Sequence, residues 1–273
     1  MIPCLSQVCS LNSPFDKDVA DYAAGACRAM EVWLTKLEAY LEQHTVDDVR
    51  RLLEAHQISL PVASYQGGLL SGQDEALRET GEHFRRRLRI CQELGIATMV
   101  VSGDFAGDLN RQHLEQAKHR LSEAADRAAE HNVRLAFEFQ GRSAFANNIQ
   151  TAVALVAECN DPNLGLCFDV FHYYTGPSKH EDLGYLTDFN LFHVQLSDLS
   201  GQLRETATDS DRILPGDGDF LLGPLIDSFR EIGYRGHVSV ELMNPKIWQI
   251  PALQFGEVGM TALRKVLGQA AME

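Results

Sequence analysis

The stretch Leu191-Phe-His-Val-Gln-Leu-Ser-Asp198, LFHVQLSD in one-letter code, places two polar side chains inside an apolar run. An apolar run of this length predicts a buried strand. His193 and Gln195 lie two residues apart, and side chains at positions i and i+2 of a strand share one face. An imidazole and an amide on one face of a buried strand are typical of a barrel strand that runs into an active site.

Seven further apolar runs, bounded by turn residues, repeat this pattern along the chain. The eight predicted strands span residues 2–8, 29–34, 59–64, 98–103, 133–139, 164–170, 191–197 and 237–243. Stretches with helical spacing alternate with them, most clearly at 74–94, 110–131, 149–158 and 220–232. Gly95 and Gly233 follow two of these stretches, as helix-capping glycines do.

An alternating chain with eight strands predicts an α/β fold, a (β/α)8 TIM barrel, with residues 1–273 as a single domain. A doubly wound parallel sheet is the alternative. No GxGxxG or GxxxxGK[ST] motif follows any predicted strand, which removes the commonest reason to prefer that alternative.

Composition limits the partners and the compartment. The formal net charge of −14 repels polyanions, so we expect no nucleic acid partner, and we interpret the basic cluster at 85–89 as a solvated helix face. No apolar run approaches the ~20 residues that span a bilayer, so we expect no membrane partner. Six scattered cysteines without a CxxC pair, and no basic segment before the apolar N-terminus, predict a cytoplasmic protein with reduced thiols.

Four consecutive predicted strands each carry an oxygen-donor side chain near the C-terminal end, where barrels of this class perform catalysis. These residues are Glu138, Asp169, Gln195 and Glu241. Three carboxylates in one apolar environment would repel one another, and buried charges must be paired or neutralised. A hard divalent cation such as Mn²⁺ or Mg²⁺ takes oxygen ligands and would remove the repulsion. The alternative is a set of separate rim residues with local partners.

Two further residues lie near these strand ends. His172 is three residues beyond Asp169, in a predicted loop, where it could move the proton next to the carbonyl of a metal-bound ketone or be structural. Arg212 precedes the turn PGDGDF, where it could hold a phosphate, a carboxylate or a sugar hydroxyl, or order the loop.

Three more residues are candidate substrate contacts. Glu31, which we place at the end of the second predicted strand, is either a group behind the ligands or an ion-pair partner. His193 stands behind or beside Gln195. Gln66 lies in the loop SYQGGLLSG, where Gly67 and Gly68 would let the backbone approach a substrate closely.

At these residues the chain resembles the xylose isomerase-like TIM-barrel superfamily of sugar phosphate isomerases and epimerases. The resemblance is strongest between residues 133 and 243 and rests on AFEF, CFDVFH, LFHVQLSD, RILPGDGDF and IGYRGHVSVEL. It implies one divalent metal ion, Mn²⁺ or Mg²⁺ with Co²⁺ as an alternative, held by the four residues above. It also implies a substrate-contacting acid/base role for His172 and a substrate-loop role for Arg212. In epimerase members, Glu138 and Glu241 also move protons, one on each face of the substrate.

Position 195 departs from the pattern of many family members, which read HxH where this chain has His193-Val-Gln195. A glutamine oxygen suits Mn²⁺, Mg²⁺ or Co²⁺ but makes the site less suited to zinc. Glutamine here is similar to the bacterial 3-dehydroshikimate dehydratases, which share the Glu/Asp/Gln/Glu order. Those enzymes carry an arginine after the third strand, where this chain has Gly67 and Gly68. The difference favours a neutral polyhydroxy ketone or a phosphosugar.

The resemblance implies a metal-dependent isomerase or epimerase of carbohydrate metabolism. It would act on a ketose, keto-sugar or sugar phosphate through metal-stabilised enediolate formation. One alternative is a dehydratase or lyase that eliminates a β-substituent from a cyclic keto-polyol, like 3-dehydroshikimate dehydratase or a 3-keto-glycoside eliminase. Another is a non-catalytic metal-binding barrel. An apurinic endonuclease shares the barrel, but its three-zinc cluster and basic DNA groove do not suit this acidic chain.

The expected partner is a small-molecule sugar or keto-polyol. Because family members are often dimers or tetramers, the resemblance also implies a homo-oligomer.

Overall fold

The computed structural model describes residues 1–70, 74–105 and 110–270. In this part of the chain, eight strands follow the order β1 to β8 in a closed barrel, and every pairing given below is parallel. They are β1 Ile2–Ser6, β2 Ala29–Trp33, β3 Ser59–Gln66, β4 Thr98–Ser102, β5 Arg134–Glu138, β6 Leu164–Asp169, β7 Leu191–Leu196 and β8 His237–Val240. The predicted (β/α)8 TIM barrel is therefore confirmed, and the doubly wound alternative is wrong.

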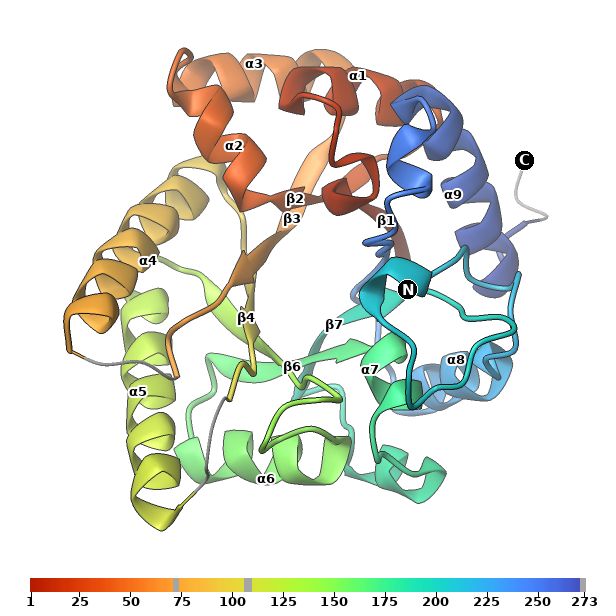
Figure 1. The fold of residues 1–273 in the computed structure, drawn as a ribbon. Helices are drawn as coiled ribbons and strands as arrows, with labels where there is room; N and C mark the ends of the chain where they lie inside the picture. Colours follow the sequence, from red (N-terminus) through yellow and green to blue (C-terminus); the bar gives the residue numbers. More distant parts are fainter. Residues whose placement is uncertain (71–73, 106–109, 271–273) are drawn as a thin grey trace. The chain divides into compact units, whose positions relative to one another are not determined.

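Helices alternate with the strands along the chain (Figure 1). They are α1 Phe15–Ala24, α2 Leu34–Leu41, α3 Val46–His56, α4 Asp74–Leu94, α5 Arg111–Glu130, α6 Ile149–Cys159, α7 Val170–Thr175, α8 Leu222–Glu231 and α9 Ala252–Val266. Short 3₁₀ helices are η1 Gln7–Ser10, η2 His180–Tyr185, η3 Asp209–Asp211 and η4 Ile247–Gln249. The four helices expected from spacing end within two residues of prediction, and Gly95 and Gly233 have positive φ values of 70° and 80°, as helix-capping glycines do.

The first and last strands are shorter than predicted. The chain leaves β1 after Ser6 and turns into η1, and β8 ends at Val240, so Glu241 lies one residue beyond the strand. The amide nitrogen of Glu241 still donates to the carbonyl oxygen of Leu196 over 3.0 Å. This bond extends the pairing of β7 and β8 by one residue, to Glu241, whose side chain is one of the predicted metal ligands.

The chain divides into two compact units. Unit 1 comprises Met1–Pro61 and Val194–Glu273, and unit 2 comprises Val62–His193. In unit 1, β8 pairs with β7 and with β1, and β1 pairs with β2. The helix α1 packs against α9, which lies far away in sequence (Figure 1). That the whole chain is one domain stays a prediction.

In unit 2, β4 pairs with β3 and β5, and β5 pairs with β6. One buried core cluster takes a residue from each strand of the unit: Val62, Val100, Ala136, Cys167 and Phe192. Side chains two residues apart share a strand face, so Glu138 follows Ala136 on one face of β5, and Asp169 follows Cys167 on one face of β6. On β5 and β6, the cluster residue therefore precedes a predicted ligand, Glu138 or Asp169, on the same strand face.

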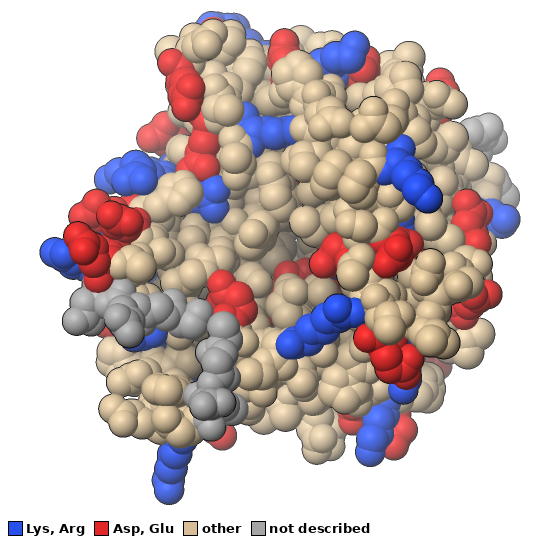
Figure 2. All heavy atoms as spheres, in the orientation of Figure 1, with Lys and Arg blue, Asp and Glu red and all other residues tan. Residues whose placement is uncertain are grey.

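Two expectations drawn from composition concern the charged side chains and the cysteines. Acidic and basic side chains are interspersed over the face drawn in Figure 2. All six cysteines are free thiols, and all except Cys159 are buried. Within the described residues, no helix combines the length and apolar character needed to cross a membrane.

Two glycines, Gly25 at the C-cap of α1 and Gly81 within α4, have opposite surroundings, which predicts opposite effects of the same substitution. A Cβ at Gly25 would lie 2.7 Å from the backbone carbonyl carbon of Gly256, whereas a Cβ at Gly81 would meet no atom within 4 Å. Gly25→Ala forces α1 and α9 apart and costs about 1–3 kcal/mol. Gly81→Ala removes a flexible residue from the interior of α4 and adds about 0.5–1 kcal/mol to the free energy of unfolding. Urea denaturation measures both, and a destabilised Gly81→Ala would contradict the open space at that position.

Candidate active site

One cluster of polar side chains lies in unit 2, at the C-terminal ends of β5 and β6. Glu138 ends β5, Asp169 ends β6, and His172 lies in α7. Each offers one ligand atom, and these atoms all lie within 4.8 Å of one another. Nε2 of His172 is 3.6 Å from Oδ2 of Asp169. All three side chains are buried, so the group is able to hold a divalent cation.

The local sequence explains how His172 reaches this cluster. Oδ1 of Asp169 accepts a hydrogen bond from the amide of Phe171 over 2.8 Å and so caps α7 directly at the end of β6. The chain turns at once into a helix, and three residues bring His172 back beside the aspartate. The expectation of a loop here was wrong, because Asp169, a predicted ligand, is itself the cap of a helix. Gln140, which the sequence reasoning missed, lies two residues beyond the end of β5 and donates from Nε2 to Oε2 of Glu138.

A second cluster lies in unit 1 and centres on Gln195 of β7. Nε2 of Gln195 donates to Oε1 of Glu31 over 2.8 Å and to Oε1 of Glu241 over 2.9 Å. All three side chains are buried, and those of Gln195 and Glu31 are fully so. The amide nitrogen is therefore committed to two carboxylates, and Oε1 is the atom that Gln195 can offer to a cation.

Glu31 lies in the middle of β2 and not at the strand end, where we had expected it. Its ladder partner on β1 is Ser6. The side chain contacts the amide of Gln195, which fits the interpretation of Glu31 as a group behind a ligand. A direct contact of Glu31 with substrate stays a prediction.

Arg212 pairs with carboxylates on two sides. Nη1 donates to Oε2 of Glu241 over 3.1 Å, and Nε and Nη2 donate to Oδ1 of Asp209 over 3.0 and 2.7 Å. The side chain is only 1% exposed, and Asn244 holds its backbone carbonyl. Arg212 thus fixes the orientation of Glu241. Asp209, three residues earlier in the chain, was missed, although an acidic residue at that spacing is a recognisable ion-pair signal.

The turn after Arg212 is organised by Asp198, the last residue of the quoted stretch. Its carboxylate accepts from the amides of Leu199 and Phe220 through Oδ1 and of Gly216 through Oδ2, each over 2.9 Å. A Cβ at Gly218 would lie 2.3 Å from Oδ1 of Asp198, so only glycine fits there. Two amides that could have cradled a phosphate are therefore already bonded to an internal anion.

The third strand ends in a polar arrangement that departs from prediction. Gln66 is buried; its Nε2 donates to the carbonyl of Gly67, and its Oε1 accepts from Nη1 of Arg87. Arg87 also donates to the carbonyl of Tyr65 over 2.9 Å. The interpretation of residues 85–89 as a solvated face was therefore wrong for Arg87, which is buried, although its neighbours at 85, 86 and 89 are exposed.

The glycine pair after β3 is tied to the neighbouring strand end. The amide of Gly68, whose φ is +74°, donates to Oδ2 of Asp104 over 2.6 Å. Burial raises the pKa of Asp104, and this hydrogen bond acts in the opposite direction. The amide of Gly68, in the backbone that we expected a substrate to approach, is thus hydrogen-bonded within the protein.

The buried thiol of Cys9 lies beneath Glu241. It accepts from the amide of Leu242 over 3.1 Å and lies 3.4 Å from the carbonyl of Val240. Burial raises the pKa of Cys9, and the carboxylates of Glu241 and Glu31 raise it further against the bond from Leu242. Burial thus favours the neutral thiol of Cys9, whose sulfur is hydrogen-bonded to the backbone on both sides of Glu241. His193, also predicted as a substrate contact, is fully buried on β7.

A barrel with buried carboxylates at successive strand ends belongs to a defined class of proteins. The profile described as "Xylose isomerase-like TIM barrel" matches residues 19–262. The chain belongs to this family.

Several proteins similar to this chain are named as enzymes. The inosose isomerase of Bacillus velezensis is 28% identical over 224 residues, which cover 80% of this chain and 79% of that protein. The 3-dehydroshikimate dehydratase of Pseudomonas aeruginosa is 26% identical over 242 residues, which cover 86% of this chain and 37% of that protein. A crystal structure described as IOLI protein with a binding zinc atom superposes with a TM-score of 0.92 at 23% identity over the whole of both chains.

The role of Asp198 generates a stability prediction. Asp198→Ala removes a buried carboxylate that accepts three backbone hydrogen bonds, so it should lower the free energy of unfolding by about 3 kcal/mol. Asp217→Ala changes an exposed acid in the same turn and should stay within about 0.5 kcal/mol of the parent. Urea denaturation of both variants is the measurement. Equal stabilities of the two variants would contradict the role assigned to Asp198.

Proposed function

We propose that the chain is a divalent-metal-dependent isomerase that acts on a cyclic keto-polyol of the inosose type by removing a proton next to its carbonyl. The observation that carries the proposal is the pair of buried carboxylates Glu138 and Asp169 at neighbouring strand ends, with the imidazole of His172 beside them; one atom from each of the three side chains lies within 4.8 Å of the other two. Similarity to inosose isomerases supports the substrate class.

The proposed ligands are Glu138, Asp169, Gln195 and Glu241, from four consecutive strands or their ends. The donor set fits a hard cation, since three ligands are carboxylates and Gln195 has only its amide oxygen to offer. When bound, the ion would polarise the substrate carbonyl and make the adjacent C–H more acidic. Mn²⁺ and Mg²⁺ suit this all-oxygen set better than zinc, which prefers nitrogen and sulfur ligands.

The remaining groups would bind and move protons. Glu138 and Glu241 are the proposed bases on the two faces of the substrate. Glu241 would be held in one orientation by Gln195 on Oε1 and by Arg212 on Oε2. His172, whose Nε2 lies 3.6 Å from Oδ2 of Asp169, would exchange a proton with a substrate oxygen. Contacts of His193, Gln66, Glu31 and Arg212 with substrate remain part of the proposal.

A neutral substrate is favoured over a phosphosugar. The amides of Gly216 and Phe220 are bonded to Asp198, and the Arg212 side chain is paired with two carboxylates. A phosphate at this turn would have to displace an internal carboxylate from charge-assisted hydrogen bonds. An inosose needs no such exchange, because its polar groups are hydroxyls and one ketone.

The second candidate is a dehydratase that removes the same proton and then expels a β-hydroxyl. Gln195 favours it, because the amide ligand resembles the ligand set of 3-dehydroshikimate dehydratases, and one of these is a relative. The two reactions share their first step. Only the fate of the intermediate separates them.

The amide ligand generates a prediction about metal preference. Gln195→His replaces an oxygen donor by an imidazole, so the ratio of Zn²⁺ to Mn²⁺ affinity should rise by at least about tenfold, equivalent to about 1.4 kcal/mol. Competition titrations with a chelating dye measure both affinities. Gln43→His, an exposed change on the same unit, serves as the control. An unchanged ratio in Gln195→His would remove Gln195 from the ligand set.

The first chemical step is tested by proton NMR in D₂O with Mg²⁺. The panel is an inosose, a free ketose, a ketose phosphate and 3-dehydroshikimate. We expect metal-dependent loss of one carbon-bound proton signal from the inosose, followed by a rearranged isomer. An elimination product from 3-dehydroshikimate, with no exchange in the inosose, would establish the dehydratase instead.

His172 provides the matched variant for this experiment. His172→Asn should bind Mn²⁺ with the affinity of the parent and slow the exchange by about 10²–10⁴-fold, as loss of a general acid/base does. Loss of Mn²⁺ binding in the variant would show that His172 is a ligand. Full exchange activity would show that it moves no proton.

A further inference from the structure

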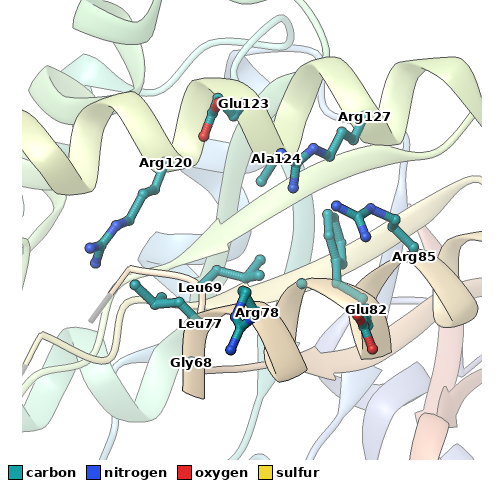
Figure 3. A pocket seen from close by; sticks show the side chains of 12 residues that line it. Gly68, Leu69, Leu77, Arg78, Glu82, Arg85, Arg120, Glu123, Ala124 and Arg127 are labelled. Carbon is teal, nitrogen blue, oxygen red and sulfur yellow. The ribbon is translucent and has the colours of Figure 1, made fainter. Parts of the chain in front are cut away.

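A groove of about 390 Å³ lies in unit 2, outside the cluster of Glu138 and Asp169 (Figure 3). The helices α4 and α5 form its two sides, and the loop after β3 contributes Gly68 and Leu69. Four arginines line it: Arg78 and Arg85 from α4, and Arg120 and Arg127 from α5. Four guanidinium groups are thus concentrated in one groove of a chain whose formal net charge is −14.

The spacing of the arginines places them on facing surfaces. On each helix the two arginines are seven residues apart, which is two helical turns, so both project from one side of the helix. The side chains of Arg85 and Arg127 reach toward one another from the two helices (Figure 3). Nη1 of Arg120 donates to the carbonyl of Leu70 over 3.1 Å, which holds that guanidinium at the end of the groove.

Among the residues that the structure describes, no ion pair joins these arginines to the carboxylates that line the groove. Glu82 and Glu123 also line the groove, yet within the described residues neither forms an ion pair with any of the four arginines. Four guanidinium groups and two carboxylates leave a surplus of two positive charges. Facing like charges repel, so a bound anion would stabilise this arrangement.

The base of the groove is apolar. Leu69 and Leu77, which are half-buried, present apolar surface there, and the other apolar lining residues, Phe84 and Ala124, are buried. Gly81 lines the groove as well, and the space above it is open to 4 Å. The volume lies within the range of about 300–1,000 Å³ typical of small-ligand sites. An apolar base beneath a rim of arginines suits a molecule with a ring and an anionic group.

We propose that this groove binds a small organic phosphate, with its phosphate oxygens on the arginines and its ring on the apolar base. A phosphate carries about −1.5 to −2 charges at neutral pH and matches the surplus charge, whereas a single carboxylate does not. The planar guanidinium fork also binds phosphate oxygens in pairs. The proposal is independent of the metal-dependent reaction, because it uses none of the residues assigned to that reaction.

The test is calorimetric titration of the full chain with ADP and, separately, with inorganic pyrophosphate, in low salt with EDTA to exclude binding through a metal ion. The pocket variant is Arg85→Gln/Arg127→Gln. The matched control is Arg86→Gln/Arg89→Gln, which removes the same two charges from exposed positions of α4 that do not line the groove. Gly81→Leu fills the open space and leaves every charge in place. Thermal unfolding checks that all variants are folded.

The parent chain should bind ADP more tightly than pyrophosphate, because only ADP has a ring for the apolar base. The pocket variant should lose affinity for both probes by at least about tenfold. Gly81→Leu should weaken ADP more than pyrophosphate, and the control should stay within about twofold of the parent in low salt. Equal loss in the pocket variant and the control would mean a general charge effect and overturn the proposal. Absence of ADP binding by the folded parent at millimolar concentration would do the same.

Discussion

The amide nitrogen of Gln195 joins two buried carboxylates, and the arrangement of unit 1 around it follows from that constraint. Glu31 and Glu241 would be costly as isolated buried ions, and each accepts a short hydrogen bond from this nitrogen. Arg212 adds a positive charge on the outer side of Glu241 and is itself held by Asp209. Each polar group in this series of contacts fixes the orientation of the next. Gln195 therefore has one orientation, and Oε1 is the atom that it would present to a metal ion.

The strand pattern was sufficient to predict the barrel, because eight apolar runs alternating with helical spacing have few other solutions. The strand ends were less predictable. Whether the chain continues as a strand or turns after Ser6, Asp169 or Val240 is decided by a cap or a neighbouring strand, and not by local apolar content. His172 is the clear case, since its helix begins because Asp169 caps it.

The candidate ligands could be named from sequence, but their partners could not. Arg87 lies within a run of basic residues, and only packing of α4 against the end of β3 distinguishes it from its exposed neighbours. We predicted no role for Asp198 from the sequence, yet its carboxylate accepts the backbone amides of the turn where a phosphate would otherwise bind. Such roles depend on backbone amides brought together from distant parts of the chain.

The central claim is that Glu138, Asp169, Gln195 and Glu241 hold one divalent ion, and crystals grown with Mn²⁺ test it most directly. Anomalous diffraction at the manganese edge would locate the ion independently of any assumed geometry. The account predicts a single peak with an oxygen atom of each of the four side chains, including Oε1 of Gln195, within about 2.3 Å. A peak held by Glu138, Asp169 and His172, with Gln195 turned away, would contradict it, as would the absence of a peak in crystals of the folded protein grown with excess Mn²⁺.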